Sequence, residues 1–83
     1  MKKKVMAFLW TGNLDQAVPS WWVEFVDAGN AVVVRKGNKI WVEIKAGNLI
    51  MIVYPGQYIA KRSDGHIFAM AADGFEKFYE IIC

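Results

Sequence analysis

The sequence predicts an α+β fold, in which a small, mostly antiparallel β-sheet meander carries one main helix packed on it. Three observations lead to this prediction. The longest unbroken apolar run, Leu49–Tyr54, is rich in β-branched residues and is bounded by turn residues, as buried strands are. From residue 31 onward, apolar and polar residues alternate in short segments separated by glycine-containing turns. Only Pro19–Ala28 shows the spacing of an amphipathic helix.

The run Leu49–Tyr54 is expected to form the central strand, buried on both faces. Its six residues are too few for a transmembrane helix, which needs about 20. An exposed strand of this composition is prone to aggregation, so neighbouring elements are expected to cover it.

The length of the chain, 83 residues, predicts a single domain over residues 1–83. Because so short a chain buries only about 60–65% of its unfolded surface, its core must be thin. Hydrophobic residues make up 55% of the sequence, and this surplus has two interpretations. Either the core is dense for a small protein, or a second subunit or a partner covers part of the apolar surface.

The charge of the chain is close to balanced, with a formal value of +2. Such a balance neither drives nucleic-acid binding nor mimics DNA, so no specific DNA binding is expected. Lys2–Lys4 and the apolar Val5–Trp10 do not form a signal peptide, because the apolar stretch is too short and no cleavage site follows. Without a signal peptide or a membrane span, the chain is expected in the cytoplasm. Cys83 is the only cysteine, which excludes an internal disulfide and a cysteine metal cluster.

The first expected strand is Val5–Trp10, and its side chains are apolar on both sides. It is therefore expected in the interior of the sheet. The main helix is expected over Pro19–Ala28, since proline suits a first helical turn, with Ser20 as the N-cap if the helix begins later. Its core-facing stripe consists of Trp22, Phe25 and Val26.

The remaining strands are expected at Ala31–Arg35, Lys39–Lys45, Leu49–Tyr54, Gln57–Arg62, His66–Met70 and Tyr79–Ile82. In the second of these, Val42 and its neighbours at a spacing of two point inward, and Trp41 points outward. Ala71–Phe78 is expected to form a short helix or a turn. The last strand is expected beside the first.

A series of short motifs runs through almost the whole chain. It comprises Trp10-Thr11-Gly12, Pro19-Ser20-Trp21-Trp22, Pro55-Gly56-Gln57-Tyr58-Ile59, Gly65-His66-Ile67-Phe68 and Asp73-Gly74-Phe75-Glu76-Lys77-Phe78-Tyr79-Glu80. This series resembles a family of small, mostly uncharacterised phage and prophage accessory proteins. The chain departs from the family at Leu9, at Gln57 and in the segment Phe68–Phe75, where two prolines and a basic residue of the family are missing. The resemblance implies a viral accessory protein in a host cytoplasm, and it implies no particular activity.

No set of nucleophile, base and orienting residue is found, so an enzyme is not expected, and neither is a cofactor or a metal. His66 is the only histidine and lies beside a turn, two residues from Asp64. It is either an exposed turn residue, or a switch or phosphate donor.

The aromatic residues are the most informative candidates. Trp21 lies off the helix stripe, and Trp41 points to a polar face. Each either folds over a neighbouring strand or contacts a partner. Aromatic rings beside cationic strand ends can also stack a base and hold a phosphate. The predicted ligand-binding residues are Trp21, Trp41, Tyr54, Tyr58, Lys61 and Arg62.

Two functions are therefore expected from different classes. The first is a phage-encoded counter-defence protein that sequesters a nucleotide signal of the host, for which a homo-oligomer would enclose a small ligand better than a monomer. The alternative is a protein-binding inhibitor or adaptor that covers a host defence enzyme, with the same aromatic residues as hot spots.

Overall fold

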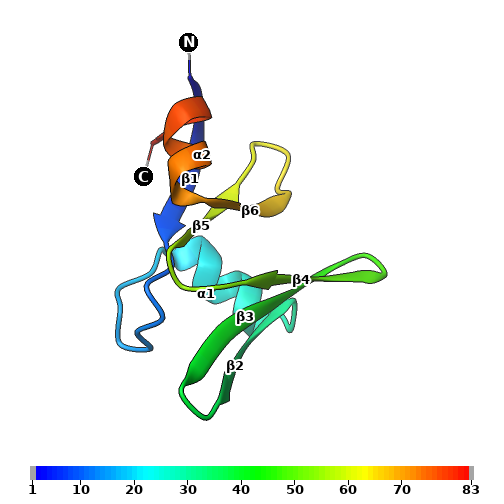
Figure 1. Cartoon of the computed structure of the whole chain (residues 1–83). Coiled ribbons are helices and arrows are strands. Elements are labelled where there is room, and N and C mark those ends of the chain that lie inside the picture. Colours follow the sequence, from blue (N-terminus) through cyan, green and yellow to red (C-terminus); the bar gives the residue numbers. More distant parts are fainter. Residues whose placement is uncertain (1, 83) are drawn as a thin grey trace. The chain divides into compact units, whose positions relative to one another are not determined.

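The computed structural model describes residues 2–82, and of residue 46 only the backbone. Cys83, for which no internal disulfide is expected, lies outside the described residues. The described part confirms the α+β prediction (Figure 1). Its elements are β1 (Lys3–Leu9), α1 (Ser20–Asp27), β2 (Ala31–Lys36), β3 (Lys39–Ala46), β4 (Leu49–Val53), β5 (Gln57–Lys61), β6 (Ile67–Ala71), α2 (Ala72–Phe78) and β7 (Tyr79–Ile81).

The chain divides into two compact units. Unit 1 comprises Met1–Thr11 and Gly56–Cys83, and unit 2 comprises Gly12–Pro55. The strands accordingly form two sheets, in the orders β6-β5-β1-β7 and β2-β3-β4. The expectation of one domain over residues 1–83 stays a prediction.

Unit 2 contains the consecutive antiparallel hairpins β2-β3 and β3-β4 (Figure 1). Gly37-Asn38 and Gly47-Asn48 form two-residue turns, and both glycines have positive φ, 61° and 65°. Glycine is favoured at such positions because it has no Cβ to clash. These turns fix the register that places alternate side chains of the three strands on common faces.

The inner face of this sheet is apolar and buried. Val42, Ile44 and Val53 are at most 1% exposed. The burial of Val42 and Ile44 confirms the inward side that was expected for the strand Lys39–Lys45. In the same unit, Trp22 of α1 is buried and stacks on Phe25 with ring centroids 5.7 Å apart. The helix follows Pro19 without a side-chain cap, and Ser20 is its first residue rather than its N-cap.

The prediction that Leu49–Tyr54 is buried on both faces was wrong. β4 is an outer strand of its sheet and pairs with β3 alone among the described strands. Leu49 is 75% exposed and Ile50 61%, whereas Val53 is fully buried. β4 therefore has the composition that is typical of a strand buried on both faces, although only one of its faces is buried.

Unit 1 contains the four-stranded sheet, with β1 between β5 and β7. This position confirms that the first strand is interior. β7 runs parallel to β1, with Tyr79 opposite Lys3, so the last strand lies beside the first as expected. The parallel pair is possible because α2 connects β6 to β7, and this pair departs from a simple meander.

The core of unit 1 is closed by α2. Phe75 of this helix is 2% exposed and packs with Val5, Ala7 and Ala60. Its ring stacks on Tyr58 at a centroid distance of 4.3 Å. The segment for which a short helix or a turn was expected is therefore a seven-residue helix, comparable in length to the eight-residue α1.

Candidate ligand-binding face

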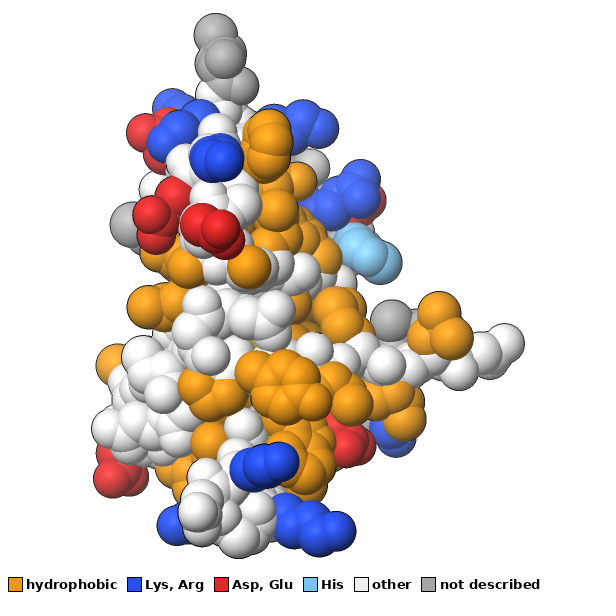
Figure 2. Space-filling view, in the orientation of Figure 1, with side chains coloured by type: hydrophobic (Ala, Val, Ile, Leu, Met, Phe, Trp, Pro, Cys, Tyr) orange, Lys and Arg blue, Asp and Glu red, His pale blue; other side chains and the backbone are white. Residues whose placement is uncertain are grey.

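The outer face of the three-stranded sheet in unit 2 carries large apolar side chains that remain exposed. We call it the open face and define it by Val32, Val34, Trp41, Glu43, Ile50 and Ile52, which the pairing of β2, β3 and β4 places on one side. Val32 is 52% exposed and Ile52 45%. Figure 2 shows hydrophobic side chains gathered over β3 and β4, with Lys and Arg side chains near the β2-β3 turn.

A depression of about 560 Å³ lies on the open face. We call it the aromatic depression, and its lining residues are Lys36, Lys39, Trp41, Glu43, Ile52 and Tyr54. It combines two of the six predicted site residues, Trp41 and Tyr54. The volume falls in the range of about 300–1,000 Å³ that small-molecule sites occupy.

Two lysines stand at the end of this depression. Lys36 and Lys39 are directly opposite in the β2-β3 register, on either side of the two-residue turn. Like charges in such a cross-strand pair repel each other and destabilise the hairpin. An anion bound between the two ammonium groups would attract both of them and offset this repulsion.

The carboxylate of Glu43 is oriented by the indole of Trp41. Trp41 Nε1 donates a hydrogen bond to Glu43 Oε2 over 3.0 Å, and both side chains are partly buried. This contact holds the Trp41 ring on the open face. A carboxylate has further acceptor sites, so Glu43 can still accept hydrogen bonds from a ligand.

A smaller depression of about 280 Å³ adjoins Glu43 on the same face. Its lining residues are Gly29, Ala31, Val32, Glu43, Lys45 and Ile50. Glu43 therefore separates two hollows, one with aromatic rings and two lysines, the other mostly aliphatic.

Trp21 has a different setting from Trp41. It lies half-buried on α1 and meets Trp22 edge to face, with ring centroids 6.4 Å apart. It is not among the residues that line the aromatic depression. The structure thus places it with the helix rather than with the other two candidates of unit 2.

The remaining three candidates lie in unit 1. Tyr58 stacks on Phe75, and its hydroxyl donates a hydrogen bond of 3.4 Å to Glu76 Oε2. Burial, and then the charge and hydrogen bond of Glu76, raise the pKa of Tyr58 above its ordinary value. Lys61 is half-buried at the end of β5, followed by the exposed Arg62.

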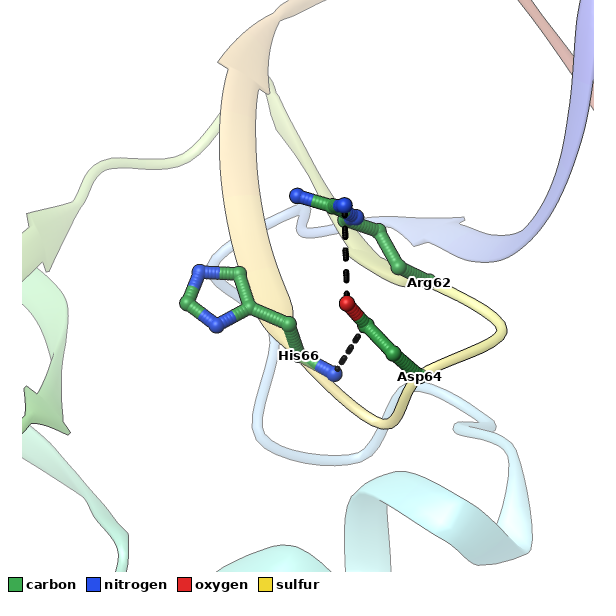
Figure 3. A network of polar contacts seen from close by, with 3 residues as sticks. All are labelled: Arg62, Asp64 and His66. Carbon is green, nitrogen blue, oxygen red and sulfur yellow. Dashed lines mark hydrogen bonds and ion pairs between the residues drawn. The ribbon is translucent and has the colours of Figure 1, made fainter.

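Arg62 lines a depression of about 510 Å³ in unit 1, together with Lys3, Lys4, Val5, Ser63, His66, Phe68 and Tyr79. In the β5-β6 turn, Arg62 Nη2 lies 3.4 Å from Asp64 Oδ2, and the backbone N–H of His66 donates to Asp64 Oδ1 over 3.0 Å (Figure 3). The hydrogen bond from His66, helped by Arg62, lowers the pKa of Asp64 below its ordinary value. His66 is exposed, and its ring points away from this carboxylate (Figure 3).

Sequence reasoning did not select Lys36, Lys39, Glu43 or Ile52. The signal for them was present in the alternation of side chains. A two-residue turn at Gly37-Asn38 places Lys36 opposite Lys39, and a period of two places Lys39 on the side of Trp41.

Among residues 2–82, no group of three or more His, Cys, Asp and Glu side chains is placed to hold a metal ion. Neither of the helices in this part of the chain has the length and apolarity to cross a membrane. Comparison with protein-family models, curated proteins and solved structures gives no match.

Proposed function

We propose that this chain is a non-enzymatic binding protein that holds a nucleotide in the aromatic depression. One observation carries the proposal: a single hollow on an exposed sheet face combines two aromatic rings, Trp41 and Tyr54, with the opposed lysines 36 and 39. Rings stack bases and ammonium groups hold phosphates, and nucleotides offer both.

The phosphate group would lie at the lysine end. Lys36 and Lys39 are both exposed, so their ammonium groups can turn toward an anion without a large change of the backbone. Glu43 repels phosphate from the other end of the depression. The charges therefore favour one orientation of the ligand over its reverse.

The base would lie over the rings. Trp41 is half-buried and held by Glu43, which reduces the entropy that is lost on stacking, and Tyr54 is 55% exposed. The Glu43 carboxylate can accept a hydrogen bond from an amino or imino group of the base. Each stacked base contributes about 1–3 kcal/mol.

The biological role that we propose is counter-defence by a phage protein that sequesters a nucleotide signal in the cytoplasm of its host. The resemblance to phage and prophage accessory proteins supports the viral origin. The near-balanced charge of +2 supports a small ligand rather than DNA.

Isothermal titration calorimetry with a panel of cyclic and linear nucleotides tests the proposal. With a nucleotide that binds, Trp41→Ala is expected to weaken the affinity about 5- to 150-fold, which corresponds to about 1–3 kcal/mol of stacking. Lys39→Ala is expected to weaken it less and to flatten its dependence on salt. Trp41→Phe retains a ring and is expected to retain most of the affinity.

Lys45→Ala is the matched control, because Lys45 lies on the same strand and face but lines the smaller depression. It is expected to leave the affinity unchanged. If no nucleotide of the panel gives heat, the proposal is wrong. If binding withstands Trp41→Ala and Lys39→Ala but is lost in Arg62→Ala, the site lies in unit 1 instead.

The alternative function, an inhibitor or adaptor that covers a host defence enzyme, is favoured by one observation. Val32, Ile50, Ile52 and Tyr54 are each 45–61% exposed and lie on the same side of the sheet, as apolar residues of a protein-binding surface do. A pull-down from host lysate that recovers one protein in stoichiometric amount, and loses it with Val32→Lys, supports this alternative. An empty pull-down counts against it.

A further inference from the structure

Among the described strands, β4 pairs on one side only, and its other edge is exposed and carries no protective residue. Its five residues, Leu-Ile-Met-Ile-Val, include no charge and no proline, the two common means by which natural edge strands avoid pairing. The opposite edge of the same sheet, β2, ends in Arg35 and Lys36. The edge strand β6 of unit 1 is also uncharged, but most of its side chains are buried or half-buried.

The backbone of β4 alternates between its neighbour and the open edge. The β3-β4 turn has two residues and closes on the pair 46–49, which is hydrogen-bonded in hairpins of this kind. Met51 and Val53 therefore direct their backbone groups toward β3. Ile50 and Ile52 direct theirs toward the open edge.

We infer that a second copy of this chain occupies this edge, with its β4 antiparallel to the first and Met51 on the two-fold axis. In this register Ile50 of each copy lies opposite Ile52 of the other. The outward N–H and C=O groups of each strand then meet those of the second strand, as an antiparallel ladder requires. The two sheets become one continuous sheet of six strands.

The side chains on the open face fit the same register. Ile50 and Ile52 of both copies form one apolar cluster, and such cross-strand pairs stabilise a sheet. Glu43 is the β3 neighbour of Ile52, and Lys45 is the β3 neighbour of Ile50. Each row across the two copies therefore carries Glu43 of one chain and Lys45 of the other.

The registers also differ in where they place these charges. If Ile52 lay on the axis, it would face its own copy, and the two Glu43 carboxylates would share a row. The register centred on Met51 brings opposite charges into each row and no like charges. The charged residues of one row lie three strand spacings apart, about 14 Å, so their attraction is largely screened by salt. The second copy is therefore inferred from the backbone groups and the isoleucine pairs of the two identical edges, which match each other in this alignment.

The pairing would extend the candidate site, a consequence that rests on the proposed function. Ile50 of the second copy would lie beside Ile52, which lines the aromatic depression. Asn48 of the second copy would lie opposite Tyr54. Each depression would gain an apolar wall from the other chain, and assembly itself would need no nucleotide.

Sedimentation of the nucleotide-free chain over a concentration series tests the assembly. A reductant is present throughout, because Cys83 could otherwise cross-link two chains. The mass is expected to rise with concentration from 9.4 kDa to twice that value and no further. A chain that stays monomeric at all concentrations overturns the inference.

Amide hydrogen exchange locates the contact. The amides of Met51 and Val53 are expected to be protected at every concentration, since they pair with β3. Those of Ile50 and Ile52 are expected to gain protection only where the dimer forms. If the mass doubles while the protection of Ile50 and Ile52 is unchanged, the dimer contact does not lie at this edge and the inference is overturned.

Ile50→Lys introduces a charge at the edge, and Ile50→Pro removes an N–H that β3 does not use. Both are expected to give monomers, with circular dichroism unchanged for the lysine variant. Val32→Lys is the matched control, because Val32 is similarly exposed on the same face but on β2, and it is expected to remain dimeric. A dimer that survives both Ile50 variants, or is lost in Val32→Lys alone, overturns the inference. The inference is also overturned if the chain stays monomeric and a different protein binds at this edge.

Discussion

The two units differ in how completely their apolar side chains are covered, although the sheet of unit 2 also has one buried face. In unit 1, α2 covers one face and buries Phe75 to 2% exposure against Val5 and Ala7. In unit 2, the open face leaves Val32 and Ile52 about half exposed. Burial in unit 1 serves stability, whereas the exposed apolar residues of unit 2 give little stability to the isolated chain and are available for contacts with other molecules.

The edge strands of the two sheets differ as well. In unit 1 the uncharged edge strand β6 keeps most of its side chains buried or half-buried. β4 of unit 2 pairs only with β3 among the described strands, although it is the most apolar strand of that sheet. In this chain, the most hydrophobic segment is an outer strand with one exposed face rather than the centre of the core.

The largest effect expected from this comparison is the loss of the unit 1 core. Phe75→Ala removes a buried ring that stacks on two tyrosines, and it is expected to lower the free energy of unfolding by about 3–5 kcal/mol. Phe78→Ala, three residues along the same helix but 63% exposed, is the control and is expected to change it by at most about 0.5 kcal/mol. Chemical denaturation measures both variants.

The same variant tests the prediction of one domain. If units 1 and 2 unfold together, Phe75→Ala also speeds amide exchange at Val42 in the core of unit 2. Exchange that is faster in unit 1 alone contradicts a single cooperative domain, and equal effects of the Phe75 and Phe78 variants contradict the assigned core.

The second expected effect compares the two faces of the sheet in unit 2. Ile44→Ala is expected to cost about 2–5 kcal/mol, because Ile44 is 1% exposed. Ile50→Ala, on the open face, is expected to leave the stability of the monomer within about 0.5 kcal/mol. Thermal unfolding at low concentration measures this difference. A large loss for Ile50→Ala in the monomer means that the open face is covered within the chain.

Local patterns in the sequence predicted the elements well. The alternation around Val42, the glycine turns and the helical spacing near Trp22 each reflect interactions between residues close in sequence, so their physical cause is visible in the chain itself. The pairing of β7 with β1 was expected as well. The boundary between the two units was not, because in the sequence the residues at 11–12 and 55–56 have the composition of ordinary turns.

The position of β4 and half of the candidate site were harder to predict. A run of apolar residues indicates how much burial is possible, and not whether a further strand or helix covers it. The composition of Leu49–Tyr54 therefore predicts two buried faces, whereas the structure has one. Trp41 and Tyr54 meet Lys36 and Lys39 only once the register is known. Tyr58 was chosen as an aromatic at a strand end, but the ring of Phe75, distant in sequence, packs on it.

The third expected effect concerns how the ends of unit 2 meet. Gly12 has φ +84°, and a Cβ there would lie 2.8 Å from Cγ of Pro55. Gly12→Ala therefore adds a clash with a rigid ring to the strain of a left-handed backbone, and the clash is expected to cost about 1–3 kcal/mol. Gly37→Ala is the control, since Gly37 has φ +61° with open space around it. Denaturation of both variants isolates the clash, and equal losses contradict a close contact between Gly12 and Pro55.

The smallest expected effect lies in the β5-β6 turn of unit 1. In this turn the carboxylate of Asp64 accepts a hydrogen bond from the backbone N–H of His66 and forms an ion pair with Arg62. The glycine turns of unit 2 contain no carboxylate in their two central positions. Because folding lowers the pKa of Asp64, its stabilising contribution is complete above the unfolded pKa, ordinarily 3.8, and is lost as the pH falls through the lowered folded value.

Asp64→Asn is therefore expected to reduce stability slightly at pH 6 and to make the loss of stability on acidification smaller than in the original chain. Denaturation at pH 6 and pH 3 measures this difference, and an NMR titration of the carboxyl carbon is expected to give a pKa below 3.8 for Asp64. Asp73 provides the comparison, because its side chain accepts a hydrogen bond from the N–H of the adjacent Gly74 and not from a residue across a turn. If Asp64 titrates at or above 3.8, its hydrogen bond does not hold the turn, and the turns of both units then depend on their glycines alone.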